Sequence, residues 1–205
     1  MIVDVPSPID LRNEADARAW TRTAMELRPF RRTFFDAFAA ALRTLDVERP
    51  RVLELGAGPG FLADHLLRAL PALSYVMLDF SAAMHALAAE RLGPRVAQVQ
   101  QVERSFKQAG FGADLGPFDA VVTMQAVHEL RHKQYAHALH AEVRGLLAPG
   151  GRYLVCDHFV GDGGMKNDQL YMTIAEQRAA LAGAGFSDVQ EILCQGGLVL
   201  HRATT

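Results

Sequence analysis

The residues best suited to chemistry lie in a short stretch, VLELGAGPG, at positions 52–60. An apolar run ends there in an acid, Glu54, and glycine then recurs at three alternate positions: Gly56, Gly58 and Gly60. Because glycine has no Cβ, this loop can turn sharply and let a ligand lie against the backbone. A second apolar run ends in Asp79, roughly 20 residues further on, where a carboxylate can bind both hydroxyls of a ribose. The pattern predicts a nucleoside site.

The glycine spacing distinguishes between kinds of nucleoside site. A dinucleotide fingerprint reads G-x-G-x-x-G, but Phe61 stands where its last glycine belongs. A side chain of that size would crowd the packing of helix on strand over a pyrophosphate. The sequence also lacks the phosphate-loop pattern G-x-x-x-x-G-K-[ST]. A nicotinamide-dependent oxidoreductase is therefore disfavoured, and the plain alternative is a glycine turn that only tightens a strand–helix joint.

A second candidate group follows the apolar run FDAVVTM at positions 118–124. His128 is a candidate general base there, because the pKa of an unperturbed imidazole lies near neutrality. Asp157 and His158 follow a later apolar run and are alternative candidates for that role. The competing interpretation is that His128 only positions its loop or faces solvent.

Residues 128–132 also spell H-E-x-x-H, the signature of zinc proteases. That motif requires a helix interior, so that both histidines share one face and bind the metal. Here it begins where a strand is expected to end, and Tyr135 stands where the extended motif has glycine. We expect no metal ligands in this chain and keep a zinc hydrolase only as an alternative.

Alternating strands and helices must position these residues. Hydrophobic periodicity and turn signals predict strands at 51–55, 74–79, 95–102, 118–124, 152–157, 186–193 and 198–202. They predict helices at 15–27, 30–45, 60–70, 81–92, 134–147 and 173–184. This order predicts an α/β fold with a doubly wound, mostly parallel, seven-stranded sheet. The link CQGG is too short for a crossover, so the last two strands must be antiparallel. Ligands of such sheets bind at the carboxyl ends of the strands.

Composition limits the function further. The chain has 205 residues, of which 50% are hydrophobic, and a net charge of −2 with interspersed signs. We expect one domain, with 1–50 as a helical N-terminal cap and 51–205 as the core. No nucleic-acid or membrane partner is expected. The first residues lack the features of a signal peptide, and Cys156 and Cys194 are expected to be buried thiols. A cytoplasmic location is the default expectation.

The cap holds further candidates. Trp20 and Met25 are candidate residues of a substrate pocket. A group of arginines is expected to form a solvated helical face rather than an anion pocket, because Glu26 and Asp36 are interleaved with them: Arg22, Arg28, Arg31 and Arg32. The polar, glycine-rich segment 159–172 is either a mobile lid or a plain surface loop.

Four motifs together resemble a known family. The pattern E-x-G-x-G-x-G resembles motif I of class I S-adenosylmethionine-dependent methyltransferases. FDAVVTMQAVHEL resembles the fourth-strand motif of that family, LLAPGGRYLVCDH the turn into its fifth strand, and AGAGFSDVQ its junction with strand six. The closing hairpin resembles the inserted antiparallel seventh strand. The resemblance extends from residue 51 to residue 205 and implies a Rossmann-like fold.

The resemblance also implies an activity, namely in-line transfer of the methyl group of S-adenosyl-L-methionine to a small-molecule acceptor. The glycine loop would hold the methionine part of the cofactor, Asp79 the ribose and Phe80 the adenine face. The residues implied in cofactor binding are Glu54, Gly56, Ala57, Gly58, Gly60, Asp79, Phe80, Met84 and Gln125. The acid that the family often carries after strand three is missing, and Val102 aligns with it. Glu103 and Ser105 are the candidate substitutes.

Two matters stay open at this point. A cofactor-binding protein without catalysis is an alternative, because methyl transfer requires no particular catalytic group. The acceptor and the oligomeric state are not determined, although TMQA in place of an N-P-P-Y motif disfavours methylation of adenine or amide nitrogen.

Overall fold

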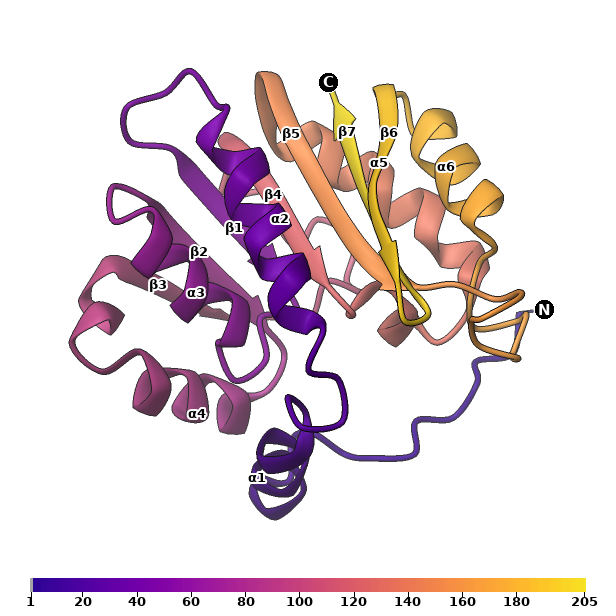
Figure 1. The fold of residues 1–205 in the computed structure, drawn as a ribbon, viewed down its shortest axis with the longest axis horizontal. Coiled ribbons are helices and arrows are strands. Elements are labelled where there is room, and N and C mark those ends of the chain that lie inside the picture. The colour runs from indigo at the N-terminus through magenta and orange to yellow at the C-terminus, as the bar shows by residue number, and fades with distance from the viewer. Residues whose placement is uncertain (1) are drawn as a thin grey trace.

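A computed structural model describes residues 2–205, which form a seven-stranded sheet with helices on both faces (Figure 1). The strands are β1 Arg51–Leu55, β2 Ser74–Asp79, β3 Val99–Glu103, β4 Phe118–Met124, β5 Leu147–His158, β6 Ser187–Gln195 and β7 Leu198–Thr204. Their order is β3-β2-β1-β4-β5-β7-β6, and β7 is antiparallel to both of its neighbours. The predicted doubly wound α/β sheet with an antiparallel last strand is confirmed.

Within residues 2–205, six α-helices and three short 3₁₀ segments accompany these strands, with α1 and α2 before β1 and the others between strands. The helices are α1 Glu14–Thr23, α2 Arg31–Arg43, α3 Phe61–Ala69, α4 Ala82–Leu92, α5 Ala136–Leu146 and α6 Ile174–Gly183. The 3₁₀ segments are η1 Gly93–Gln98, η2 Val127–Leu130 and η3 Lys133–Tyr135. Ser81 caps α4 as expected, because its side-chain oxygen accepts a hydrogen bond from the Met84 amide at 3.2 Å.

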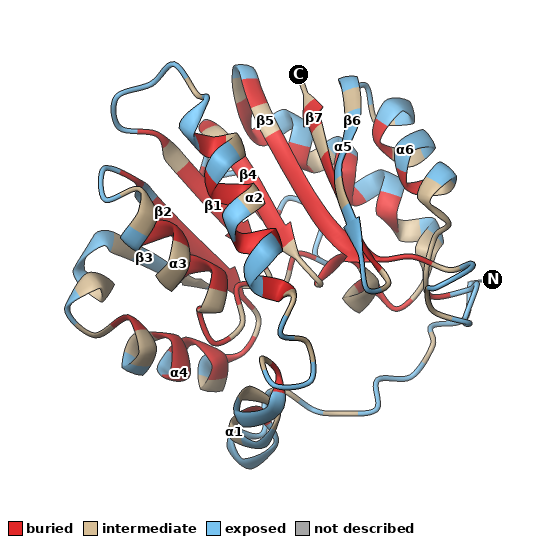
Figure 2. Ribbon diagram, viewed as in Figure 1, coloured by how far each residue is buried: buried red, intermediate tan, exposed pale blue. Residues whose placement is uncertain are grey.

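Each face of the sheet carries its own apolar core. Helices α2, α3 and α4 cover one face, and α5 and α6 cover the other (Figure 1). The strands between them are largely buried, as Figure 2 shows in red. Phe34, Phe38 and Leu42 of α2 pack on the sheet beside Val52. Helix α2 therefore belongs to the layer that covers the sheet, while α1 lies apart from it, against α4 (Figure 1).

Two local expectations were wrong. The strand expected from Arg95 begins only at Val99, because residues 93–98 form η1. Pro94 lies in the first turn of η1, where its fixed φ suits a helical start. Cys156 is buried as predicted, but Cys194 is exposed, because β6 is the edge strand of the sheet. Within residues 2–205 no helix is long and apolar enough to cross a membrane.

Candidate active site

A cavity of about 890 Å³ opens at the carboxyl ends of β1, β2, β4 and β5. The chain crosses from β3 to β4 at this point, so β1 and β4 lie side by side where the topology reverses. Ligands of open α/β sheets bind at such a place. Ligand pockets commonly measure roughly 300–1,000 Å³, so this cavity has room for a nucleoside cofactor and a small acceptor together.

The glycine loop between β1 and α3 forms one wall of the cavity. Gly56 has φ of 64°, and a Cβ there would overlap the Cβ of Ala126. Only glycine fits this position, because the backbone is left-handed and the neighbouring loop is close. The Gly58 amide donates a hydrogen bond to Asp79 Oδ2 at 2.8 Å. The loop and the end of β2 are thereby joined into one cradle.

Two buried carboxyl groups face this cradle. Glu54 is 2% exposed and accepts a hydrogen bond from the Tyr75 hydroxyl at 3.0 Å. Burial, opposed by the Tyr75 hydrogen bond, raises the pKa of Glu54 to about 8, and the charge of Asp79 adds to the rise. Burial also raises the pKa of Asp79, against the hydrogen bonds from Gly58 and Ser81. A bound cation near Glu54 would favour its ionised form.

Most of the residues implied in cofactor binding line the cavity. They are Glu54, Gly56, Ala57, Gly58, Asp79, Phe80, Met84 and Gln125. In the described chain Gly60, Glu103 and Ser105 are not among the lining residues, and Phe106 lies beside the cradle instead. One face of the Phe80 ring is covered by the Arg12 guanidinium, 4.6 Å from the ring centroid. Sequence reasoning missed Phe106, since an apolar residue after β3 gives no chemical signal.

His128 and Asp157 form a close pair at the ends of β4 and β5. His128 Nδ1 lies 2.7 Å from Asp157 Oδ1, and the His128 amide donates to Asp157 Oδ2 at 2.8 Å. His128 lines the cavity, while Asp157 is buried behind it. Asp157 therefore positions the imidazole, an arrangement in which a carboxylate fixes the tautomer and orientation of a histidine base.

The charges around His128 favour its protonated form. Burial alone would lower its pKa, but the charge and hydrogen bond of Asp157, followed by those of Glu129, raise the pKa of His128 to about 9. The same pairing holds the pKa of Asp157 below its usual range despite its burial. The pKa of His128 therefore lies above that of an unperturbed imidazole, because two carboxylates stabilise the imidazolium.

The H-E-x-x-H residues do not share a helix face. His128 lies in η2, which ends at Leu130 and is followed by Arg131 in a left-handed conformation with φ of 70°. His132 lies beyond that turn and caps η3 through a bond from the Gln134 amide. His128 is committed to Asp157, so the two imidazoles have separate roles. Among residues 2–205 no group of three or more His, Cys, Asp or Glu side chains is arranged to hold a metal ion.

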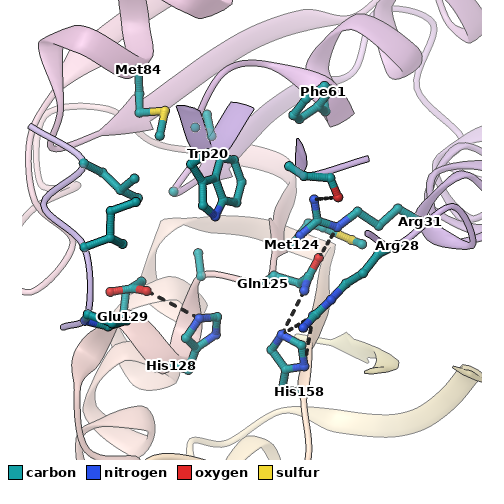
Figure 3. A pocket seen from close by; sticks show the side chains of 18 of the residues that line it. Trp20, Arg28, Arg31, Phe61, Met84, Met124, Gln125, His128, Glu129 and His158 are labelled. Carbon is teal, nitrogen blue, oxygen red and sulfur yellow. Dashed lines mark hydrogen bonds and ion pairs between the residues drawn. The ribbon is translucent and has the colours of Figure 1, made fainter. Parts of the chain in front are cut away.

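Two arginines of the cap enter the site, contrary to expectation. Arg31 is 8% exposed and donates to Gln125 Oε1 at 2.6 Å, and Arg28 lies 2.7 Å from His158 Nε2 (Figure 3). The expected solvated face holds for Arg22 and Arg32, which are exposed. A signal was present in the sequence. Arg31 shares the apolar stripe of Phe34, Phe35 and Phe38, and no acid stands three or four residues from it.

Three further segments close the cavity. Trp20 of α1 lies inside it (Figure 3), whereas Met25 packs against the core below α2. The N-terminal residues cross the opening, where Arg131 donates from Nε to the Val5 carbonyl at 2.8 Å. Segment 159–172 contributes lining residues from its middle and its C-terminal part, namely residues 164–167, 170 and 171. It is therefore part of the cavity wall and more than a plain surface loop.

The fold and the site define a class of protein. The strand order with an antiparallel β7 and the acid–glycine cradle are those of the seven-stranded methyltransferases. Residues 53–153 match the protein family described as "Methyltransferase domain". In the solved structure of human N-acetylserotonin methyltransferase with its bound SAM, the fold matches with a TM-score of 0.72 at 18% identity, over 95% of this chain and 57% of that one. The family match and the shared fold support a class I S-adenosylmethionine-dependent methyltransferase family for this chain.

Curated relatives share parts of the sequence. Malonyl-[acyl-carrier protein] O-methyltransferase of Magnetococcus marinus is 40% identical over 80 residues, which is 39% of this chain and 28% of that protein. Highly reducing polyketide synthase stpks1 of Strobilurus tenacellus is 28% identical over 174 residues, which is 70% of this chain and 6% of that protein. The matches thus cover less than a third of the length of either relative.

Proposed function

We propose that the chain transfers a methyl group from S-adenosylmethionine to a small-molecule acceptor. The observation that carries this proposal is that the Glu54–Asp79 cradle and the His128–Asp157 pair open into one cavity. Cofactor and acceptor could therefore lie side by side in it. Holding two reactants in line can contribute roughly 7–11 kcal/mol of the barrier reduction.

The residues of the cradle fit this cofactor. Asp79, joined to the loop by the Gly58 amide, faces the position of a ribose, and Glu54 offers a carboxyl group to an ammonium. Phe80, Met84 and Phe106 supply an apolar wall for an adenine ring. When bound, the cofactor supplies a methyl group already activated by its sulfonium. The protein then needs chiefly to orient the acceptor and exclude water.

His128 is the proposed proton acceptor of the reaction. Its imidazole lines the cavity, with Nδ1 held by Asp157 and Nε2 3.4 Å from Glu129 Oε1. Because its pKa lies at about 9, the neutral form that accepts a proton grows as the pH rises toward that value. His158 is kept neutral by its surroundings and is the second candidate.

We also propose that residues 1–205 act as one domain, with 1–50 as its N-terminal cap, and that it works in the cytoplasm. The continuous core between α2 and the sheet supports a single domain. The net charge of −2 with interspersed signs supports a small-molecule acceptor over a nucleic acid.

The experiment that tests this function is calorimetric titration of the metal-stripped protein with S-adenosylhomocysteine. NAD is the control ligand. Micromolar binding of S-adenosylhomocysteine, near one per chain, with no binding of NAD, is the expected result. Absence of S-adenosylhomocysteine binding would contradict the proposal.

A further inference from the structure

Two arginines in the cavity have no negatively charged partner. Arg28 lies in the turn between α1 and α2, and Arg31 is the first residue of α2. Both line the cavity. Among all described residues, neither forms an ion pair with a carboxylate. Arg31 is nevertheless almost fully buried, where an unpaired charge is costly.

Neutral side chains hold the two guanidinium groups side by side (Figure 3). Arg31 Nε donates to Gln125 Oε1 at 2.6 Å, and Gln125 Nε2 lies 2.9 Å from His158 Nε2. Arg28 Nη1 lies 2.7 Å from the same nitrogen. Because two donors meet at His158 Nε2, that nitrogen is unprotonated. Burial, with the neighbouring charges of His128 and Arg28, keeps the pKa of His158 at about 4 despite the opposing charge of Asp157. The bridge therefore carries no charge at neutral pH.

Hydrogen-bonding capacity is left over on both arginines. Arg31 Nη1 donates to the Ala24 carbonyl at 2.9 Å, but within residues 2–205 its Nη2 has no partner. The Nε and Nη2 groups of Arg28 likewise form no hydrogen bond with the described chain. Guanidinium groups bind planar carboxylates through paired N–H donors. Arg28 offers one such fork, formed by Nε and Nη2, and Arg31 offers its free Nη2 beside it. No carboxylate of the described chain is paired with either guanidinium.

The strain of the backbone at Gln125 supports a built site. Gln125 has a backbone φ of 56°, a value that residues other than glycine rarely adopt. This conformation brings its amide between Arg31 and His158. Strained residues of this kind concentrate at functional sites, where surrounding contacts hold them in place.

The arginines lie at the acceptor end of the cavity. Gln125 follows β4 and His158 ends β5, whereas Asp79 ends β2. Strands β2 and β5 are three steps apart in the sheet, which is roughly 14 Å at the usual strand spacing. His128 and Asp157 lie at the same two strand ends as the arginines. The paired arginines therefore face the acceptor's side of the proposed reaction.

We propose that Arg28 and Arg31 bind a carboxylate of the methyl acceptor. This inference rests on the proposed function, because it places the acceptor in the same cavity. The neighbouring lining is apolar or aromatic, with Trp20, Leu27 and Tyr171. Trp20 also packs against Arg31, whose guanidinium carbon lies 5.7 Å from the ring centroid. The acceptor class is thus a carboxylic acid with an aromatic or aliphatic body.

The test compares acids with their neutral amides. The protein is first saturated with S-adenosylhomocysteine and then titrated with benzoate, benzamide, hexanoate and hexanamide. We expect each acid to bind at least tenfold more tightly than its amide. Arg28→Gln and Arg31→Gln should remove this preference, and Arg32→Gln, an exposed residue of the same helix, should retain it. Arg28→Gln is the principal variant, because Arg28 is only half-buried and its loss disturbs folding least.

Several results would overturn the proposal. One is that the acids bind no better than the amides, or not at all. Another is that the preference survives in Arg28→Gln. Tighter binding of phenyl phosphate than of benzoate would assign the arginines to a phosphate. Weaker S-adenosylhomocysteine binding in Arg28→Gln, with 5′-methylthioadenosine binding unchanged, would assign them to the carboxylate of the cofactor itself. If the wild type fails to bind S-adenosylhomocysteine, the proposed function fails, and benzoate titration of the unloaded protein still tests the arginines.

Discussion

Two carboxyl groups at the ends of β1 and β2 differ in how the fold uses them. Asp79 accepts hydrogen bonds from the Gly58 and Ser81 amides, so it organises the loop as well as facing the cavity. Glu54 has one donor, Tyr75, and is deeply buried with a pKa of about 8. We therefore expect Asp79 to contact a ligand directly, and we expect the ionisation of Glu54 to depend on the charge of that ligand.

The Asp79→Ala variant tests the first of these roles. Loss of its hydrogen bonds should weaken S-adenosylhomocysteine binding by about 1–3 kcal/mol, the cost of leaving buried donors unpaired. Glu103→Ala is the matched control, because Glu103 is exposed on the adjacent strand end and paired in register with Asp79. Calorimetry measures both. Unchanged affinity in Asp79→Ala would remove that residue from the site.

The raised pKa of Glu54 predicts that a proton is released when the cofactor binds. At pH 7 its carboxyl group is protonated, because its pKa is about 8, and an ammonium placed beside it favours ionisation. S-adenosylhomocysteine affinity should therefore rise with pH up to about 8. Calorimetry at pH 7 in two buffers of different ionisation enthalpy should detect the proton, and Glu54→Gln should abolish it. Equal heats in both buffers would contradict this.

His128 and Asp157 make a prediction that requires no acceptor. The imidazole of His128 should titrate with an apparent pKa of about 9, observable by NMR. Asp157→Asn removes the principal charge that stabilises the imidazolium and should lower this pKa by roughly 1–3 units. His128→Ala should leave S-adenosylhomocysteine affinity unchanged, since the pair lies beyond the cradle. A pKa below 7 in the wild type would mean that Asp157 does not pair with it.

At the scale of elements, the turn from β1 into α3 determines the shape of the cradle. Its glycines are all left-handed, but their surroundings differ. A Cβ on Gly56 would overlap Ala126, whereas one on Gly58 would meet open space. The two positions therefore separate the cost of backbone strain from the cost of overlap.

Alanine at each position measures these costs. Gly58→Ala should destabilise the fold by about 1–2 kcal/mol, the penalty for a left-handed residue with a side chain. Gly56→Ala should cost about 1–3 kcal/mol more, because the loop carrying Ala126 must shift. Urea unfolding of both variants gives the difference. Equal losses of unfolding free energy in the two variants would show that the loop carrying Ala126 shifts without an energetic penalty.

At the scale of the whole molecule, buried groups titrate in opposite directions. Burial, with neighbouring positive charges, lowers the pKa of His140 to about 3 and those of His158 and His201 to about 4. By contrast, the pKa of His128 is raised to about 9 and that of Glu54 to about 8. The three histidines with a lowered pKa favour the folded state while they are neutral. His128 and Glu54 favour the folded state while they are protonated.

Stability should therefore be greatest near pH 6.5. As the pH falls below 6.5, the unfolded chain takes up protons on three histidines that the folded chain keeps neutral, and the folded state loses stability. Glu54 acts in the opposite direction down to pH 4.5, because its carboxyl group is protonated in the folded chain and ionised in the unfolded one. The net loss is about 2–3 kcal/mol per pH unit. As the pH rises toward 9, stability falls because His128 and Glu54 lose their protons.

Urea unfolding from pH 4.5 to 9 measures this profile. The control is His201→Leu, since neither ring nitrogen of His201 has a hydrogen-bond partner in the described chain. This variant should reduce the loss on the acid side by about 1 kcal/mol per pH unit. If the free energy of unfolding falls equally steeply below pH 6.5 in both proteins, His201 is not kept neutral in the folded state.

The sequence by itself predicted the local features, namely several strands and the residues of the cradle. Strands β1, β2 and β4 coincide with the predicted ranges, because each is an apolar run bounded by turn residues. The glycine spacing and the acid after β2 marked the cradle for the same reason. These signals are local, so no knowledge of neighbouring elements was needed to find them.

Only the tertiary structure decided what distant residues do to one another. Arg28 and Arg31 are brought to His158 and Gln125 by the packing of α2 on the sheet, across more than ninety positions of sequence. The ionisation of His128 likewise depends on Asp157, which arrives from a different strand. Charge interactions and burial act through space, so their outcome follows from the fold and not from the order of residues in the chain.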